Sequence, residues 1–568
     1  MSALRTSLDQ ALTLHERHSR PGLPDRGFVL DRAADAPLPA IRHVDGRVVL
    51  APDAHVHRMS PAPDGRRIAI EWAEDAGEDA VLGIVEVTSG ALRLHPGIRL
   101  RYDEVLWGED SRSLEVVASR DGMLVALDVD SGAWTASPLA PALRTRLFPG
   151  GSRGLLAQTT RGDGTTLRDR ATGTLLGRWP ALHRALPLRD GVLAWHVDGL
   201  DALDLSGAVR WTHRDATLRI TDVAVAADDR IVALGVRDGR SIVVRVDADD
   251  AHPLEFTAVG EATVTGVSTD DGILHLAVEG PLTPPRIVTE TQAAVASDAA
   301  VGATLGVTTR IDPTARDGET LTVHVTSPVD ATGPRPLLLA CYGGFGVPHL
   351  PVFEPTVPAW VAHGGSYATA QIRGGGERGD GWRTAGSGTR KQQAVDDLAD
   401  IARDLVDRGI TLPDLLVLVG ASLGGVIAAS CALQHPGLCA GVVTTAAPLD
   451  LLSLADHPLG ARWLSEFGDD GTLEARERLR RLSPLALAED RTDAVGLPAF
   501  LGITLGRDSR VRAVDTRRTV EALQRVGASA RLWTAPSAGH GANALTDLHE
   551  LGLTVLDFAA DVTGGGAR

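Results

Sequence analysis

The pattern Gly-x-Ser-x-Gly, which can place a nucleophilic serine on a sharp turn, occurs twice in this chain. One copy contains Ser152 and the other contains Ser422. A nucleophile elbow needs a buried strand before the serine and a helix after it, because the turn must lift the hydroxyl out of the sheet. The apolar run LLVLV precedes Ser422 and VIAASCALQ follows it, whereas the strand-like GLLAQTT follows Ser152. We therefore predict Ser422 as the nucleophile and assign Ser152 to a hairpin turn.

A serine hydroxyl needs a general base, and the base needs an acid that fixes its tautomer. In folds with this elbow, the acid and then the histidine follow the serine along the chain. Asp508 comes directly after the strand-like run AFLGITLG, whereas Asp515 falls in the next helical stretch. Of the two histidines beyond, His540 lies in a glycine-flanked loop and His549 in a helical pattern. The predicted triad is therefore Ser422, Asp508 and His540, and the alternative for Asp508 is a turn or helix-capping role.

Strand-like and helical stretches alternate from about residue 315 onwards. Apolar strands such as PLLLAC and LLVLVG are nearly continuous, and residues 391–409 carry apolar side chains at helical spacing before ending at a glycine. Such alternation indicates a doubly wound, mostly parallel sheet with helices on both faces. We expect residues 301–568 to form an α/β-hydrolase catalytic domain.

The first half of the chain consists of short strand-like runs separated by turn signals, which recur about every 40 residues, a spacing that suits four-stranded blades. Six signals precede comparable strands, and a segment around residues 45–46 would open or close a seventh blade. We therefore predict a β-propeller over residues 25–300, with a tandem of irregular β-sandwiches as the alternative. The signals are Asp64-Gly65, Asp110-Ser111, Gly151-Ser152, Asp190-Gly191, Asp228-Asp229 and Asp271-Gly272.

The remaining segments are assigned from their composition. Residues 1–24 are predicted to form a helical segment that packs on the catalytic domain. The domain boundary is placed near residues 290–315, where PLTPPRIV and the Thr/Ala-rich stretch after it resemble a connector.

The net charge of −17 argues against a nucleic-acid partner held through phosphates. It favours cationic over anionic substrates, unless the cleft carries a local charge of its own. No secretory signal, membrane span, metal motif or cofactor motif is recognised, so we expect a cytoplasmic protein without a cofactor. The expected oligomeric state is a monomer or weak homo-oligomer. The three cysteines form neither a disulfide framework nor a zinc pattern and are expected in the core; they are Cys341, Cys431 and Cys439.

One glycine-rich run is treated as a decoy. Residues 374–379 fit the dinucleotide-binding pattern Gly-x-Gly-x-x-Gly after a strand. A dinucleotide site also requires a helix to start at the glycines, and the sequence DGWRTAGSG after them does not predict one.

Several motifs, in this order, resemble the prolyl oligopeptidase family of serine peptidases. They are YGGFG at 342–346, QIRGGGE at 371–377, GASLGG at 420–425, RW at 462–463, EFG at 466–468, SPL at 483–485, residues 504–511 and AGHG at 538–541. The resemblance covers residues 335–545, and the first half only as architecture. It implies cleavage of short peptides on the carboxyl side of proline through an acyl-enzyme.

The resemblance also implies roles for individual residues. The Tyr342 phenol and the Leu423 backbone N–H would form the oxyanion hole, which physically needs two donors converging on one oxygen. Arg510 would hold a carbonyl of the bound peptide. Flat aromatic rings would form the proline pocket, since that side chain offers area but no donor; the residues are Phe345, Trp463 and Phe467.

The sequence departs from the family pattern in places, and other functions stay open. Leu423 stands where the family usually has asparagine, and the propeller half is short. The alternatives are a related oligopeptidase with another P1 preference, processing of one dedicated precursor peptide, an esterase, and an inactive propeller binding protein.

Overall fold

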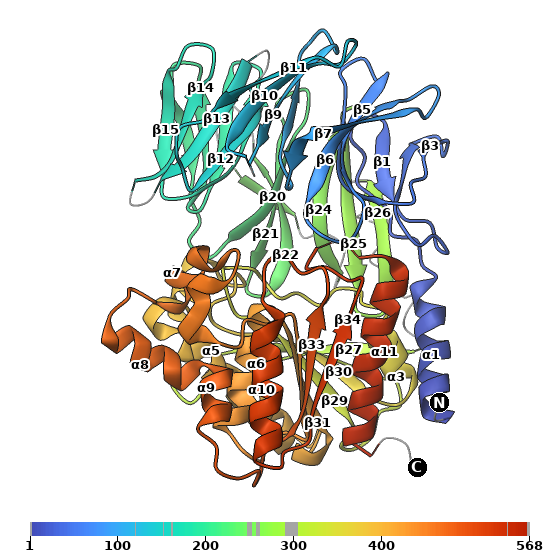
Figure 1. Cartoon of the computed structure of the whole chain (residues 1–568), viewed down its shortest axis with the longest axis vertical. Coiled ribbons are helices and arrows are strands. Elements are labelled where there is room, and N and C mark those ends of the chain that lie inside the picture. The colour runs from blue at the N-terminus through green and yellow to red at the C-terminus, as the bar shows by residue number, and fades with distance from the viewer. Residues whose placement is uncertain are drawn as a thin grey trace.

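A computed structural model describes residues 3–119, 121–150, 153–160, 163–246, 253–256, 262–289, 305–541 and 543–564. The chain begins with helix α1 (Ala3–Glu16), continues through a ring of small sheets and ends in a domain built on one large sheet. Figure 1 shows the ring stacked on the carboxyl-terminal domain, with α1 lying alongside the latter.

The described residues of the first half form seven small antiparallel sheets arranged as propeller blades. Five have four strands, and the first and last have three. The blades are β1 (Phe28–Asp31), β2 (Ala40–His43) and β3 (Val48–Leu50); β4 (His55–Pro61), β5 (Arg67–Ala73), β6 (Ala80–Glu86) and β7 (Leu92–Leu100); β8 (Val105–Trp107), β9 (Ser113–Ala118), β10 (Met123–Asp128) and β11 (Trp134–Pro138); β12 (Arg144–Gly150), β13 (Arg153–Thr160), β14 (Gly164–Asp169) and β15 (Leu175–Trp179); β16 (Leu182–Leu188), β17 (Gly191–His196), β18 (Gly199–Asp204) and β19 (Val209–His213); β20 (Arg219–Val225), β21 (Ile231–Arg237), β22 (Arg240–Val246) and β23 (Pro253–Phe256); β24 (Thr263–Asp270), β25 (Ile273–Gly280) and β26 (Thr283–Thr289).

The six predicted turn signals mark the same place in their blades, between the first and second strands, whereas residues 45–46 lie between the second and third strands of the first blade. Gly65, Asp229 and Gly272 have φ of 67°, 64° and 75°, in the left-handed region that Gly, Asn and Asp tolerate best. Residues 151–152 lie outside the described residues, between the paired strands β12 and β13. The predicted propeller of seven blades is confirmed.

The segment PLTPPRIV, predicted as part of the interdomain connector, is instead strand β26. Two prolines are tolerated there because β26 is an edge strand that, within the described ranges, pairs only with β25. The predicted boundary at residue 300 lies outside the described residues, in 290–304.

The carboxyl-terminal domain has an eight-stranded sheet in the order β27-β28-β30-β29-β31-β32-β33-β34. The first two pairings are antiparallel and the others are parallel, which confirms the predicted doubly wound α/β fold. Its strands are β27 (Gly306–Ile311), β28 (Thr322–Pro328), β29 (Leu337–Cys341), β30 (Ser366–Gln371), β31 (Leu416–Ala421), β32 (Gly441–Thr445), β33 (Ala499–Leu505) and β34 (Ala530–Ala535).

Helices cover both faces of this sheet because successive strand residues point to opposite sides, and both sets are apolar. Residues of α5, α6 and α10 belong to the core on one face, and residues of α1, α3 and α11 to the core on the other. The three cysteines are buried, as predicted. No helix within the described ranges is long and apolar enough to cross a bilayer. The helices are α3 (Thr356–Ala362), α4 (Gly379–Ala385), α5 (Gln392–Asp407), α6 (Leu423–Gln434), α7 (Leu464–Phe467), α8 (Leu473–Leu482), α9 (Pro484–Glu489), α10 (Ala513–Arg525) and α11 (Leu545–Val562).

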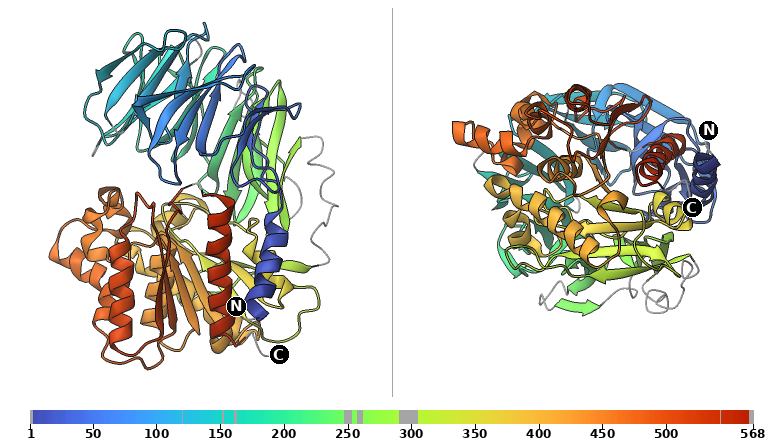
Figure 2. Two further views of the ribbon diagram at one scale, coloured as in Figure 1. Left: turned by 45° about the vertical axis from the view of Figure 1, so that its right-hand side comes forward. Right: turned by 90° about the horizontal axis from the view of Figure 1, so that it is seen from below.

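Helix α1 precedes the propeller in sequence but packs on the carboxyl-terminal domain (Figure 2). Leu8 and Leu12 are fully buried in the same core as α11. His549 of α11 contacts Glu16 and Asp9 of α1 at 2.7 and 2.8 Å. The α/β domain is therefore packed from both ends of the chain, and the segment between them forms the propeller.

Candidate active site

Ser422 occupies a strained turn between β31 and α6. Its backbone has φ 52° and ψ −124°, a conformation rarely adopted by a non-glycine residue. The amide of Ser422 donates to the carbonyl of Thr445 on β32 at 2.8 Å, which fixes the turn to the sheet. Ser422 is half-buried and directly follows β31, so it lies at the carboxyl edge of the sheet.

Two glycines allow the strand and helix to approach closely at this turn. A Cβ at Gly420 would collide with the carbonyl oxygen of Gly424. A Cβ at Gly424 would collide with the carbonyl oxygen of Cys341 at the end of β29. The glycines of the predicted elbow are therefore required by packing, in the strand-turn-helix context that the sequence predicted for Ser422.

Asp508 and His540 form a hydrogen-bonded pair at the same edge. Asp508 follows β33, His540 follows β34, and the Nδ1–H of the imidazole donates to Asp508 Oδ2 at 2.8 Å. The other carboxylate oxygen accepts from the amides of Arg510 and Val511 at 2.7 and 2.9 Å. Because the carboxylate is held at both oxygens, it can fix the orientation and tautomer of the imidazole.

Ser422 lies at the same sheet edge. Ser422 and His540 are both described residues, and no hydrogen bond joins them. Strand β31 carries the serine, and β33 and β34 carry the acid and the base. Catalytic hydrogen bonds of this kind are often loose before substrate binds and tighten in the complex.

Asn543 holds the loop of His540 and was not identified from the sequence. Its side-chain oxygen accepts from the Gly539 amide at 2.7 Å, and its NH₂ group donates to the Gly539 and Gly541 carbonyls at 3.0 and 3.3 Å. Three hydrogen bonds from one side chain fix a loop that glycines alone would leave mobile. A compositional signal exists, because Asn543 is the only asparagine in the chain.

The propeller packs directly on this loop. A Cβ at Gly539 would collide with the carbonyl of Ala76, and a Cβ at Gly541 would collide with the hydroxyl of Tyr102. Both partners belong to the propeller, at positions between its strands. The loop of His540 therefore lies at the interface between the two domains.

Tyr342 and Leu423 lie where two donors could converge. Tyr342 follows β29, the neighbour of β31, and Leu423 is the first residue of α6, where backbone N–H groups have no partner within the helix. Burial, and then the nearby Glu466 carboxylate, raise the pKa of Tyr342, so the phenol stays protonated as a donor. The Leu423 side chain is 2% exposed and packs against Gly344, so only its backbone is available to a substrate.

A buried ion pair lies beneath the Tyr342 loop. The Lys391 ammonium donates to Glu466 Oε1 at 2.6 Å and to the carbonyls of Gly343 and Gly386 at 2.8 and 3.2 Å. Its three donors are therefore all used, at a side chain that is 2% exposed. The sequence prediction missed this residue, although Lys391 is the only lysine among the 56 basic residues of the chain.

The three predicted pocket aromatics differ in exposure. Phe345 and Trp463 are half-buried, whereas Phe467 is 3% exposed, with the Lys391 ammonium 5.9 Å from its ring centroid. The Trp463 ring lies 5.5 Å from that of His457. Phe467 therefore offers little surface to a ligand in this conformation.

Asp515, the competitor for the acid role, is bound elsewhere. It contacts Nε2 of His457 at 3.0 Å, and both side chains are fully buried. The amide of Arg512 donates to the other imidazole nitrogen at 3.1 Å. Asp515 therefore supports the wall behind Trp463 and not the His540 loop.

Arg510 is engaged by the propeller. Its Nε donates to Glu78 Oε1 at 2.8 Å, and a second guanidinium nitrogen contacts the same oxygen. Ser509 and Arg101 also contact Glu78, which is 1% exposed. Burial opposes the charge of Glu78, but its hydrogen bonds to Arg510 and Ser509 lower its pKa to about 2.

The decoy run at 374–379 does lead into a helix, contrary to the sequence prediction, because the seven-residue α4 starts at Gly379. The run is nevertheless filled by protein. Trp382 of α4 folds back and donates to Ile372 and Glu377 at 3.1 and 3.0 Å, and a Cβ at Gly376 would collide with Gly346. A pyrophosphate has no room there.

Known proteins share the carboxyl-terminal half in sequence and the whole chain in fold. Residues 351–566 match the profile of the Prolyl oligopeptidase family. An uncharacterized peptidase, y4nA of Sinorhizobium fredii, is 30% identical over 239 residues, which cover 42% of this chain and 32% of the relative. The prolyl oligopeptidase ophP of Omphalotus olearius is 33% identical over 212 residues, covering 37% and 28%. These matches thus span about a third or less of the relatives' lengths.

Two solved structures extend the similarity in fold to the propeller. One, from a study of two prolyl endopeptidases, has a TM-score of 0.86 at 20% identity and covers 99% of this chain and 92% of that one. Oligopeptidase B from Leishmania major has a TM-score of 0.82 at 16% identity, covering 100% and 90%. The arrangement of a propeller on an α/β-hydrolase domain is therefore shared across the full length.

Proposed function

We propose that the protein is a serine oligopeptidase that cleaves short peptides after proline, because residues 351–566 match the model of the Prolyl oligopeptidase family. The observation that carries this proposal is the hydrogen-bonded pair of Asp508 and His540 at the sheet edge that also carries the strained Ser422. A dyad at the ends of β33 and β34 has the chain order expected for this type of hydrolase.

In the proposed reaction His540 takes the proton of Ser422, and the serine oxygen attacks the carbonyl carbon of the scissile peptide bond. The oxyanion that forms accepts hydrogen bonds from the Tyr342 phenol and the Leu423 amide. His540 then gives its proton to the leaving amine, and the acyl-enzyme remains. Water, deprotonated by His540, attacks the ester and releases Ser422. Asp508 keeps the proton of the imidazole on Nδ1 and stabilises the imidazolium.

The charges around the site favour a neutral P1 side chain such as proline. Two carboxylates beside residues of the proposed subsites are already used: Glu466, next to Phe467, by Lys391, and Glu78 by Arg510. A cationic P1 side chain would thus lack an available carboxylate at either position. The half-buried rings of Phe345 and Trp463 supply flat apolar surface instead.

The propeller supports the restriction to short or unstructured peptides. Ala76 and Tyr102 of the propeller lie against the His540 loop, and Glu78 lies against Arg510, so the active site is at the interface between the two domains. A folded protein is too bulky to reach a serine in that position, whereas an extended peptide can pass.

The test is a panel of blocked peptides that differ only in the P1 residue, with Pro, Ala, Leu, Glu and Arg, read by mass spectrometry. We expect cleavage after proline to be fastest, and Ser422→Ala to remove all cleavage and all labelling by a fluorophosphonate. Equal cleavage by wild type and Ser422→Ala would refute the mechanism. Fastest cleavage after arginine would keep the triad and overturn the proline preference.

A further inference from the structure

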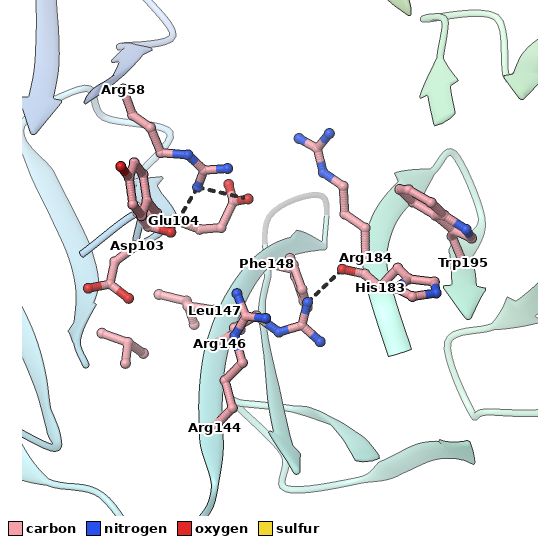
Figure 3. A pocket seen from close by; sticks show the side chains of 12 residues that line it. Arg58, Asp103, Glu104, Arg144, Arg146, Leu147, Phe148, His183, Arg184 and Trp195 are labelled. Atoms are coloured by element: carbon pink, nitrogen blue, oxygen red, sulfur yellow. Dashed lines mark hydrogen bonds and ion pairs between the residues drawn. The ribbon is translucent and has the colours of Figure 1, made fainter. Parts of the chain in front are cut away.

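The propeller contains a cavity lined by arginines that the proposed catalytic steps do not use. Its volume is about 240 Å³, and Figure 3 shows the side chains around it. Arg58 comes from β4, Arg144 and Arg146 from β12, and Arg184 from β16. The carboxyl groups in its lining are Asp103 and Glu104. The cavity therefore has an excess of positive charge inside a chain whose net charge is −17.

The backbone of the first strands aims these side chains into the cavity. Arg144 and Arg146 are two residues apart on β12, so they point to the same face. On β4 and β16 the pairing register shifts immediately before Arg58 and Arg184, and such bulges turn side chains away from the regular alternation. In Figure 3, side chains from all three strands face the same space.

The positive charge is only partly neutralised by the protein. Arg58 pairs with Glu104 at 3.3 Å. Arg146 donates to backbone carbonyls of β16, at 2.6 Å to that of His183 and also to that of Leu182. The structure gives Arg184 no hydrogen bond or ion pair to any described residue, although Arg184 interacts through space with the carboxylates of Asp25 and Asp222.

The pKa values of two neighbouring groups are lowered by burial and by the excess of positive charge in the cavity. Burial, and then the nearby charge of Arg144, lower the pKa of Arg146 to about 10. Burial, and then the surrounding arginines, lower the pKa of His183 to about 4, so the imidazole is neutral. An anion entering the cavity would relieve this repulsion and gain charge-assisted hydrogen bonds from planar guanidinium groups.

The cavity adjoins a second one that reaches the loop of Asp508. A second cavity, of about 700 Å³, shares Tyr102, Asp103 and Arg144 with the first. Its other wall includes Ser509 and Arg510 from the loop that carries the catalytic acid. A peptide chain that lies along Arg510 would therefore approach the arginine cavity at Tyr102, Asp103 and Arg144.

We propose that the cluster of Arg58, Arg144, Arg146 and Arg184 binds a carboxylate of the peptide substrate at a distance from the scissile bond, so that the enzyme selects acidic oligopeptides. This proposal rests on the proposed peptidase function and reverses the preference for cationic substrates that the net charge suggests. The carboxylate is either an acidic side chain or the free carboxyl terminus of the peptide, and both present the same two oxygens to a guanidinium.

Two variants change the cavity in opposite directions. Arg184→Gln removes the guanidinium that has no partner among the described residues, so none of the hydrogen bonds seen there is lost. Glu104→Gln removes the carboxylate that competes for Arg58, and Arg184→Lys keeps the charge without the planar fork. Arg66→Gln, on the exposed turn between β4 and β5, is the matched control that removes one arginine elsewhere on the propeller.

The probes are blocked peptides with one proline at the cleavage site and a single glutamate placed two to six residues to either side, each matched by a glutamine peptide. A further pair compares a free carboxyl terminus with its amide. Binding is measured by fluorescence anisotropy on the Ser422→Ala protein, and kcat/KM on proteins with Ser422 intact. Each comparison is made at low and high salt, because screening weakens a charge contact.

We expect the best glutamate peptide to bind about tenfold or more tightly than its glutamine match at low salt, as for a hydrogen bond to a charged group. Arg184→Gln should bring this ratio close to one, Arg184→Lys should restore part of it, Glu104→Gln should raise it, and Arg66→Gln should leave it unchanged. A ratio near one in the unmodified cavity, or a ratio insensitive to Arg184→Gln, overturns the proposal. Binding without cleavage in wild type refutes the peptidase function but not this site.

Discussion

The two domains place their charged side chains differently. In the α/β domain, buried charges are paired within the domain: Lys391 with Glu466, and the Asp508 carboxylate with His540 and two amides. In the propeller, Glu78 reaches across the interface to Arg510, and Arg184 faces a cavity without a partner among the described residues.

This difference indicates a division of roles. Charges paired inside one domain do not need the other domain as a partner, so the proposed catalytic acid and base are paired by the α/β domain itself. Charges that face an interface or a cavity respond to domain closure and to the ligand. Variants of the first kind should therefore alter the chemical step or the stability of one domain, whereas variants of the second kind should alter closure and selection.

The largest effect is expected for Asp508→Asn. An amide in place of the carboxylate no longer favours the imidazole tautomer that accepts the serine proton, and in well-studied serine proteases this change lowers kcat about 10⁴-fold. We expect a similar fall in kcat and in fluorophosphonate labelling, with a nearly unchanged melting temperature. Asp515→Asn is the matched control: it should lower stability through His457 and leave labelling of the folded protein intact. The reverse outcome would exchange the roles of the two aspartates.

Lys391→Met tests whether paired charges position the Tyr342 loop. The variant leaves Glu466 buried without a partner, and breaking such a pair costs about 3–5 kcal/mol. We expect loss of stability of the α/β domain, measured by urea unfolding with a probe in that domain, and a fall in kcat because Gly343 loses its donor. The double variant Lys391→Met with Glu466→Gln should be more stable than the single one. Equal instability of both would show that the uncompensated charge is not the cause.

The sequence predicted those features that local patterns determine. The elbow at Ser422 could be distinguished from Ser152 because strand and helix formation depend on neighbouring residues. The blade turns could be located because their backbone favours Gly, Asp and Asn. The same reasoning wrongly placed the residues of β26 in a connector. Two adjacent prolines do not indicate a strand unless the strand is known to lie at the edge of a sheet.

Features that depend on distant parts of the chain were not predicted. Glu78 and Arg510 are 432 residues apart, and the arginines of the cavity come from three blades. No local pattern relates such residues, because only the folded geometry brings them together. Lys391 and Asn543 are intermediate cases, because their contacts are nonlocal or irregular but their rarity is visible in the sequence. Lys391 is the only lysine in a chain whose other basic residues are arginines, and Asn543 is the only asparagine.

Glu78→Gln should weaken the contact between the domains. A glutamine cannot neutralise both Arg101 and Arg510. Loss of hydrogen bonds to a charged group corresponds to about a tenfold to hundredfold shift in the equilibrium between the closed and open arrangements of the domains. We expect faster amide hydrogen exchange in residues 539–541, with exchange in α5 unchanged. Because the pKa of Glu78 is lowered to about 2, wild-type closure should be constant above pH 5 and weaken only as the pH falls towards that value.

The matched control for this variant is Asp79→Asn. Asp79 is the next residue, and its pair with Arg99 is exposed and lies within the propeller. Removing it should leave exchange at the His540 loop unchanged. If Glu78→Gln and Asp79→Asn give the same exchange as wild type, the contact between the domains does not depend on the charge of Glu78. The proposed difference between the two domains would then not hold for the residues at their interface.

The smallest effect is expected for His549→Ala, which tests how the α/β domain holds the helix that leads into the propeller. Burial lowers the pKa of His549, but the hydrogen bonds to Glu16 and Asp9 outweigh it and raise the pKa above 6.5. A raised pKa means that the stabilisation is complete below the unfolded value and is lost as the pH rises through the folded one. The contribution is about 1 kcal/mol or less, as for a partly exposed pair.

Hydrogen exchange in α1 should therefore differ between wild type and His549→Ala at pH 5.5 and converge at pH 9, after correction for the intrinsic rate. Arg5→Gln is the control, because Arg5 pairs with Asp557 of α11 at 2.9 Å and neither residue type normally changes charge in this range. Its effect should be the same at both pH values. A difference for His549→Ala that persists at pH 9 would mean that packing, and not the charge of the imidazole, holds α1 on α11.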